Sequence, residues 1–194
     1  MVNTGKRIST VIGGILVVII IILLIYMDVS RRSSEEKAAN NKSLTEAGKL
    51  LERDLNTNYP ETPREVAKFY SSITKTLYSG LGDDEVKALA KKILELYDEE
   101  FLQVNPEENY LKDLYSDIAA WNKADRKITN YLLVNEEMEE KWEADGREYA
   151  TVFVSYYILE NGKASETRRY LLRKSEEGKW KILGWDHKTG SEDN

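Results

Sequence analysis

The spacing of apolar residues changes twice along this chain, and each change predicts a different kind of element. Residues 11–27 form an uninterrupted apolar run without a charge. From Ser43 to Trp121, apolar residues recur every three to four positions, which is typical of amphipathic helices. From Lys127 onward they alternate with polar residues, as they do in strands. We therefore expect one apolar helix followed by an α+β domain in which helices precede strands.

The apolar run Val11–Met27 has the length of a membrane-spanning helix. As a helix it would measure about 26 Å at ~1.5 Å per residue, close to the ~30 Å hydrocarbon core of a bilayer. A cleaved signal peptide is the alternative, but its apolar region is usually shorter, and no small-residue cleavage site follows this run. The sequence predicts a single-pass transmembrane helix over residues 11–27 that partners the lipid bilayer, with a short N-terminal tail over 1–10 and a polar stalk over 28–42.

The charges that flank this run do not decide its orientation. Lys6 and Arg7 precede it, while Arg31 and Arg32 follow it, so the excess of basic residues on the cytoplasmic side gives no clear direction. A short basic tail before a single anchor is the usual layout of an exported domain. We expect a protein of the cell membrane with its C-terminal domain outside.

Sequence signals for helix starts divide the first half of the globular region, which we place at residues 43–187. Capping boxes occur at Ser43–Glu46 and Thr62–Glu65, the second with Pro63 at the first helical position. A third helix is predicted to begin at Asp83 or Asp84, and a fourth at Asn105–Pro106. We therefore expect about four helices in this half.

The second half of the globular region carries strand and turn signals. Short polar turns contain Asp145-Gly146, Asn161-Gly162 and Glu177-Gly178, and such turns join neighbouring antiparallel strands. We predict a curved antiparallel sheet of four to five strands with the helices on its concave face, and a flexible tail over residues 188–194. The predicted strands are residues 127–134, 138–143, 147–159, 164–174 and 179–186.

Helices followed by a curved antiparallel sheet that ends in Gly178–Trp185 resemble the NTF2-like or cystatin-like folds. The whole layout is similar to an uncharacterised family of small membrane-anchored clostridial proteins. That resemblance covers the anchor and five further segments, namely Asn58–Val66, Tyr97–Glu100, Tyr110–Leu114, Leu171–Lys174 and Trp180–Ile182. The family has no established activity, so the resemblance implies a bacterial α+β fold and a topology and no chemistry.

Composition excludes several kinds of function. Lys6 and Arg7 are the only charged residues before Asp28, so the rest of the chain carries 26 basic and 34 acidic side chains, a net charge of −8. Such a domain is repelled by phosphate backbones, and we expect no nucleic-acid partner. The chain has no cysteine, which excludes disulfides, thiol catalysis and thiolate metal sites.

The sequence offers few candidates for catalysis, so we predict a protein that is not an enzyme, with no catalytic residue, metal or other cofactor. The single histidine, His187, adjoins a polar tail and is expected to be exposed and without a role. Acidic clusters such as Asp98–Glu100 are expected to be solvated. An enzyme is the weakest alternative, and it would use Asp113 or Asp117, which share a helix face at i and i+4.

Aromatic residues provide the second functional hypothesis, because the chain contains 12 tyrosines and 4 tryptophans. Some of them could line a cavity between helices and sheet that senses a small molecule or a glycan. Alternatively these rings are simply core. The candidates for pocket lining are Tyr110, Trp121, Tyr131, Phe153, Tyr157, Tyr170 and Trp185.

Alternation along residues 147–159 supports the leading hypothesis. Tyr149, Phe153 and Tyr157 fall on one face of this strand, and Val154 and Tyr156 fall on the other, so both faces are apolar. The sequence thus favours a membrane-tethered, non-enzymatic binding or assembly domain that engages a protein partner or a second copy through the second face of its sheet.

The residue pair Arg168-Arg169 makes the following strand locally basic. Adjacent strand residues point to opposite faces, so these two arginines do not form one patch. We interpret them as protection of an exposed sheet edge against strand pairing.

Overall fold

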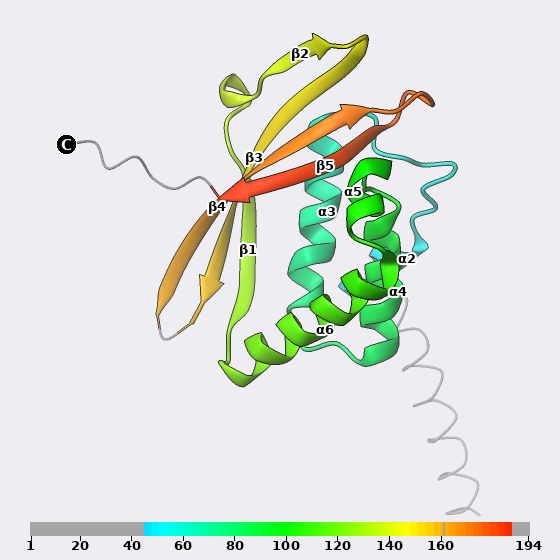
Figure 1. Ribbon diagram of the computed structural model, residues 1–194. Coiled ribbons are helices and arrows are strands. Elements are labelled where there is room, and N and C mark those ends of the chain that lie inside the picture. Colours follow the sequence, from blue (N-terminus) through cyan, green and yellow to red (C-terminus); the bar gives the residue numbers. More distant parts are fainter. Residues whose placement is uncertain (1–44, 161, 188–194) are drawn as a thin grey trace, which may run out of the picture. The chain divides into compact units, whose positions relative to one another are not determined.

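The computed structural model describes residues 45–160 and 162–187, which form an α+β fold with its helices on one side of an open antiparallel sheet (Figure 1). The predicted α+β class is confirmed. The described residues contain five α-helices, one more than the four expected. They are α2 (Glu46–Glu52), α3 (Pro63–Leu77), α4 (Asp83–Leu94), α5 (Glu99–Val104) and α6 (Glu107–Lys123).

The sheet has five strands, all paired antiparallel. Strand β3 pairs with β4 along almost its whole length, so β1 and β2 share the other edge of β3, one at each end. The order is β1-β3-β4-β5, with β2 beside β1 on β3. The strands are β1 (Lys127–Leu133), β2 (Lys141–Ala144), β3 (Arg147–Leu159), β4 (Lys163–Lys174) and β5 (Trp180–His187).

The second strand is shorter than the sequence predicts, because residues Glu136–Met138 form a 3-10 turn before it. Arg64, in the first turn of α3, fixes this connection. Its guanidinium donates to the carbonyl of Val134 at 2.9 Å and forms a salt bridge with Glu139. Helix α3 therefore fixes the chain segment that connects β1 to β2.

Helix α5 was not expected as a separate element, since Asp98–Glu100 was assigned to a solvated acidic cluster. Asp98 is in fact buried, and its carboxylate accepts a hydrogen bond from the Glu100 backbone N–H at 2.9 Å, which caps the helix. Glu99 and Glu100 are exposed, as predicted. An acidic side chain at a cap can resemble a surface cluster when only the sequence is known.

Helix α3 begins as its capping box predicts. Thr62 accepts a hydrogen bond from the Glu65 backbone N–H at 3.1 Å, and Pro63 occupies the first helical position. The Glu65 side chain reaches back to the Glu61 N–H at 2.9 Å. Each bond satisfies a backbone donor at the start of the helix.

We expect Thr62→Ala to lower the free energy of unfolding by about 1 kcal/mol, because one N-terminal amide of α3 loses its acceptor. Chemical denaturation of the full chain, followed by circular dichroism, measures this difference. Thr62→Ser keeps the hydroxyl and is the matched control. Equal losses in the two variants would show that the side-chain cap contributes nothing.

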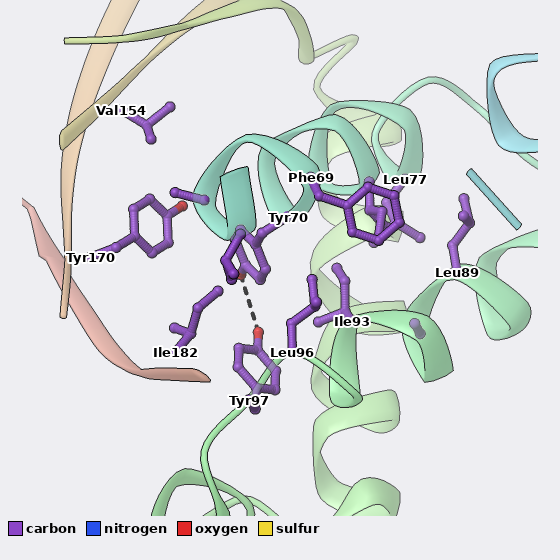
Figure 2. Close-up of a cluster of buried hydrophobic side chains, with 14 of the residues drawn as sticks. Phe69, Tyr70, Leu77, Leu89, Ile93, Leu96, Tyr97, Val154, Tyr170 and Ile182 are labelled. Carbon is purple, nitrogen blue, oxygen red and sulfur yellow. Dashed lines mark hydrogen bonds between the residues drawn. The ribbon is translucent and has the colours of Figure 1, made fainter. Parts of the chain in front are cut away.

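The core lies between the helices and one face of the sheet. The register aligns Leu172 with Ala150 and Tyr170 with Val152, and all four side chains are fully or nearly fully buried. Figure 2 shows Tyr170 and Ile182 from the strands facing Tyr70 of α3. We call the other side of the sheet the outer face; it carries Phe153, Tyr157 and Leu171 by the same alternation.

The predicted anchor Val11–Met27, the tail 1–10, the stalk 28–42 and the C-terminal tail 188–194 lie outside the described residues. Within the described part of the chain, none of the helices combines the length and the apolar character needed to cross a membrane.

Candidate functional site

A cavity of about 370 Å³ opens between helices α3, α4, α5 and α6 and the strands β4 and β5. Six of its lining side chains are aromatic, and three of its lining residues carry a formal charge. The remainder of the wall is mostly aliphatic. The aromatic residues are Tyr70, Tyr78, Tyr97, Phe101, Tyr110 and Trp185, and the charged ones are Asp113, Asp117 and Arg168.

Tyr97 is at the centre of the aromatic wall. Its ring centroid lies 4.2 Å from that of Phe101, 5.7 Å from Tyr110 and 6.0 Å from Trp185. Tyr70 approaches it from α3 at 5.9 Å. Rings from three helices, one strand and the connection between α4 and α5 therefore meet at one point.

The backbone around Tyr97 explains why its side chain is held there. Ile182 of β5 donates its N–H to the carbonyl of Leu96 and accepts from the N–H of Asp98, both at 2.8 Å. The segment between α4 and α5 thus adds a short parallel bridge to the edge of β5. This bridge fixes Tyr97 against the sheet before α5 begins.

The tyrosine hydroxyls satisfy one another inside the domain. Tyr70 and Tyr97 share a hydrogen bond of 3.1 Å, drawn as the dashed line in Figure 2. Behind them, the Tyr156 hydroxyl lies 2.7 Å from both Ser71 Oγ and the Tyr170 hydroxyl. These bonds allow polar atoms to lie in the core without the cost of an unsatisfied group.

Burial raises the pKa of the phenol groups of Tyr70, Tyr97, Tyr156 and Tyr170 above the ordinary value of 10.0. Because the folded-state pKa is the higher one, these groups contribute full stability below about pH 10, and that stability is lost as the pH rises further. We expect the domain to unfold cooperatively above pH 10, with tyrosinate absorbance appearing together with the loss of circular dichroism. Gradual ionisation of all tyrosines in a folded domain would contradict this expectation.

The charged part of the wall comes from α6 and β4. Asp113 and Asp117 lie one turn apart on α6 and are exposed to solvent. Asp117 accepts a hydrogen bond from the Tyr78 hydroxyl. Burial is the main cause that raises the pKa of the Tyr78 phenol, and the hydrogen bond to Asp117 and its negative charge raise it further. Arg168 donates its Nε–H to Glu166 at 2.5 Å, and Glu166 also lies 3.1 Å from His187 Nδ1.

The charged groups of the wall are either exposed to solvent or already paired within the domain. A catalytic acid is usually desolvated, whereas both aspartates stand at the exposed side of the cavity. Among the described residues, no group of three histidine, aspartate or glutamate side chains is placed to hold a metal ion. Flat rings with a few charged groups are the usual lining of small-molecule sites.

Of the seven aromatic residues that the sequence proposes as pocket lining, the structure places only some at the cavity. Tyr110 and Trp185 line the cavity. Tyr170 and Trp121 lie behind it, each in ring contact with a lining residue. The remaining three are elsewhere: Tyr131 bonds Ser72 of α3 at 2.6 Å, while Phe153 and Tyr157 belong to the outer face.

The sequence matches the domain of unknown function DUF6715 over residues 1–185. The chain belongs to the DUF6715 family. This agrees with the resemblance to an uncharacterised family. No curated protein matches the sequence. The DUF6715 match includes every residue that lines the cavity.

Several lining residues of this DUF6715 chain were assigned other roles from the sequence. Tyr70 and Tyr97 are not among the aromatic residues that the sequence proposes for the cavity, and Arg168 was interpreted as protection of a sheet edge. The assignment of Arg168 was wrong, because at this position β4 pairs with β3 on one side and with β5 on the other. Arg168 and Arg169 do point to opposite faces, and Arg169 pairs with Asp186 in solvent. The available signal was a tyrosine, instead of a leucine, at one buried position of α3, Tyr70.

His187 of the DUF6715 chain is exposed, as predicted, with 62% of its side chain accessible. It is not without contacts, since its Nδ1 approaches the same Glu166 oxygen that accepts from Arg168. The imidazole therefore lies beside the charged part of the wall without entering the cavity.

Proposed function

We propose that this DUF6715 protein is a membrane-tethered, non-enzymatic binding protein that holds a small molecule in the aromatic-lined cavity. The observation that carries the proposal is the cavity itself, an open space of about 370 Å³ with six aromatic residues in its lining. Pockets of this size and lining are where small molecules are usually bound. An NTF2-like or cystatin-like cone, with helices over a curved sheet, is the kind of fold in which such a cavity forms.

Two of the three rings that would have filled such a cone point away from it. Phe153 and Tyr157 lie on the outer face, and Trp185 stands at the cavity wall. A packed cone would have excluded a ligand. The space between Trp185 and the helices therefore supports the small-molecule hypothesis over a purely structural role for these rings.

Ligand screening by saturation-transfer NMR tests the proposal on the full chain in lipid nanodiscs. We expect hits from a fragment set of cations, anions, neutral compounds and sugars, and we expect Trp185→Ala to abolish their binding. Trp142→Ala is the matched control, because Trp142 stacks on Tyr149 on the outer face. Phe101→Ala removes a second lining ring from another element. Hits that bind all variants equally, or no hits, would overturn the proposal.

We propose assembly through the outer face as a second function. Large apolar side chains remain exposed there, with Leu132 at 55% and Tyr157 at 41% accessible. Trp142 and Leu159 extend the same face. Exposed apolar surface of this kind is typical of protein interfaces, and a second copy of the chain or another protein would cover it.

Because the chain has no cysteine, any disulfide cross-link must form at a single introduced cysteine. Ser165, opposite Tyr157 on the outer face, is exposed, as is Ser116 on α6. If copies pair through the outer face, Ser165→Cys cross-links as a disulfide dimer in membranes and Ser116→Cys does not. Equal or no cross-linking in both variants would contradict self-assembly through this face.

We place the globular domain outside a bacterial cell, with residues 11–27 in the membrane. The uncharged run and the short basic tail before it support this topology. Ser116→Cys tests it, because a membrane-impermeant maleimide labels an external cysteine on intact cells. Labelling only after lysis would place the domain inside.

A further inference from the structure

The aromatic faces around the cavity are not occupied by the protein's own cations. Elsewhere in the described residues, basic side chains cover aromatic rings, for example Arg126 at 4.1 Å from the Trp121 centroid and Lys181 at 4.8 Å from Tyr59. No such pair involves any of the six rings that line the cavity, within the described chain. The face of an aromatic ring attracts positive charge within about 6 Å of its centroid.

The spacing of the rings makes this attraction cumulative. Tyr97, Tyr110 and Trp185 belong to the same wall, and the centroid of Tyr97 lies 5.7 Å from Tyr110 and 6.0 Å from Trp185. A small ion in the cavity beside one of these rings is therefore within reach of a second. Several rings around one cation form the kind of cage that binds quaternary ammonium groups.

The charges of the wall have the sign that such a ligand needs. The side-chain carboxylate of Asp113 forms no hydrogen bond or salt bridge with any residue that the structure describes, so its charge is available to a ligand. Asp117 adds a second carboxylate one turn later. The single basic residue among the lining residues described, Arg168, is already paired with Glu166 at 2.5 Å. The wall is therefore negative on balance.

Asn105, a further polar residue of the wall, also offers an acceptor to the ligand. Asn105 donates one side-chain N–H to the carbonyl of Phe101 at 3.0 Å, which leaves its amide oxygen as an acceptor and its second N–H as a donor. Asp113, Asp117 and Asn105 together offer oxygen acceptors in the lining of the cavity. A ligand rich in N–H or O–H groups satisfies them, whereas a carboxylate or phosphate does not.

We propose that the cavity selects small organic cations, in particular substituted ammonium ions. The apolar groups of such an ion would contact the rings, and its positive charge would face the rings and the α6 carboxylates. This inference rests on the proposed function, because it names the chemical class of ligand for the same cavity. A neutral molecule of the same shape gains the contact area and loses both electrostatic contributions.

A pair of isosteric probes separates charge from shape. Choline and 3,3-dimethyl-1-butanol differ mainly in the replacement of the ammonium nitrogen by carbon. We would titrate each into the full chain in nanodiscs made without choline lipids, and follow the ligand signals by NMR. We expect saturable binding of choline and at least about tenfold weaker binding of the neutral alcohol. Tetramethylammonium and benzyltrimethylammonium extend the cationic set.

A charge variant tests the contribution of α6. Asp113→Asn is expected to weaken choline binding several-fold and to leave the neutral alcohol unchanged. Asp125→Asn is the matched control, because Asp125 follows the end of α6 and does not line the cavity. Its backbone has a positive φ of 48°, which asparagine tolerates. Equal weakening of both ligands by Asp113→Asn would assign this residue a structural role and count against the inference.

The outcomes distinguish this inference from the proposed function. If the neutral alcohol binds as tightly as choline and Trp185→Ala abolishes both, the cavity binds ligands without selecting cations, and only the inference fails. Stronger binding of glycine betaine, which adds a carboxylate, would assign recognition to Arg168 and would also overturn it. If none of the three cations binds while neutral compounds from the fragment set do, the inference fails. If nothing binds, both fail.

Discussion

Replacement of Arg173 by methionine is expected to destabilise the domain by about 3–5 kcal/mol, the largest effect of any single change considered for this chain. Arg173 is only 6% exposed and Asp98 only 4%. The guanidinium donates through Nε to Asp98 Oδ2 at 3.0 Å and also bonds the second oxygen of the same carboxylate. Methionine fills a similar volume but leaves the Asp98 charge buried without its cation.

The ion pair between Asp98 and Arg173 also holds α5 and the connection before it against the sheet. Asp98 also caps α5 and follows Tyr97, whose bridge to β5 forms the edge of the cavity. The Arg173 guanidinium bonds Glu100 of α5 at 2.7 Å as well. Loss of Arg173 would therefore loosen the connection between α4 and α5 from the sheet.

Arg169→Met is the matched control. Arg169 lies four residues earlier on the same strand and face, and it pairs with Asp186, but both side chains are 52% exposed. Exposed pairs contribute about 0–1 kcal/mol, because water screens both charges. Urea denaturation of the full-length variants, followed by tryptophan fluorescence, measures both losses. Similar values for Arg173→Met and Arg169→Met would refute the special role of the buried pair.

The double variant Asp98→Asn/Arg173→Met provides a second check. Removal of the carboxylate charge together with its cation avoids an uncompensated buried ion. We expect the double variant to be more stable than Arg173→Met alone. A purely additive loss would indicate that the two side chains stabilise the fold independently.

Leu172→Ala is expected to cost about 2–5 kcal/mol, the usual range for a buried leucine truncated in a packed core. Leu172 is fully buried opposite Ala150, on the face covered by the helices. Alanine at this position would leave a cavity between β4 and the helices. Thermal or urea denaturation of the full chain measures the loss.

Leu171→Ala removes the same atoms from the adjacent residue. Leu171 is only partly buried and belongs to the outer face. We expect its truncation to cost less than half as much as that of Leu172, since fewer packing contacts are lost. Equal losses would mean that the outer face is buried as deeply as the helix-covered face. That result would itself favour a partner on the outer face.

Local signals in the sequence were sufficient for most individual elements. The Thr62 cap with Pro63 predicted the start of α3, and the turn at Asp145-Gly146 is confirmed, with both residues in the left-handed region that such a hairpin requires. The alternation along β3 assigned Tyr156 and Phe153 to opposite faces, as found. Each of these features depends on residues within a few positions of one another.

The sequence failed where a contact joins distant segments. Asp98 was placed in solvent, because nothing near it in the chain indicates Arg173, which is 75 residues away. Arg168 was assigned to an edge, since strand order is not encoded within a strand. The 3-10 turn that shortens β2 depends on Arg64, which is 75 residues from its partner Glu139.

For this DUF6715 chain, the sequence by itself determined the α+β class, the order in which strands follow helices, and which residues along β3 share a face. Periodicity and caps encode these properties locally. Only the tertiary structure decided which aromatic rings surround a cavity and which charges face it. Tyr70, Tyr97, Tyr110, Arg168 and Trp185 come from segments spread over more than half of the chain. Their meeting depends on the bridge between Tyr97 and Ile182 and on the strand order β3-β4-β5, which no local pattern specifies.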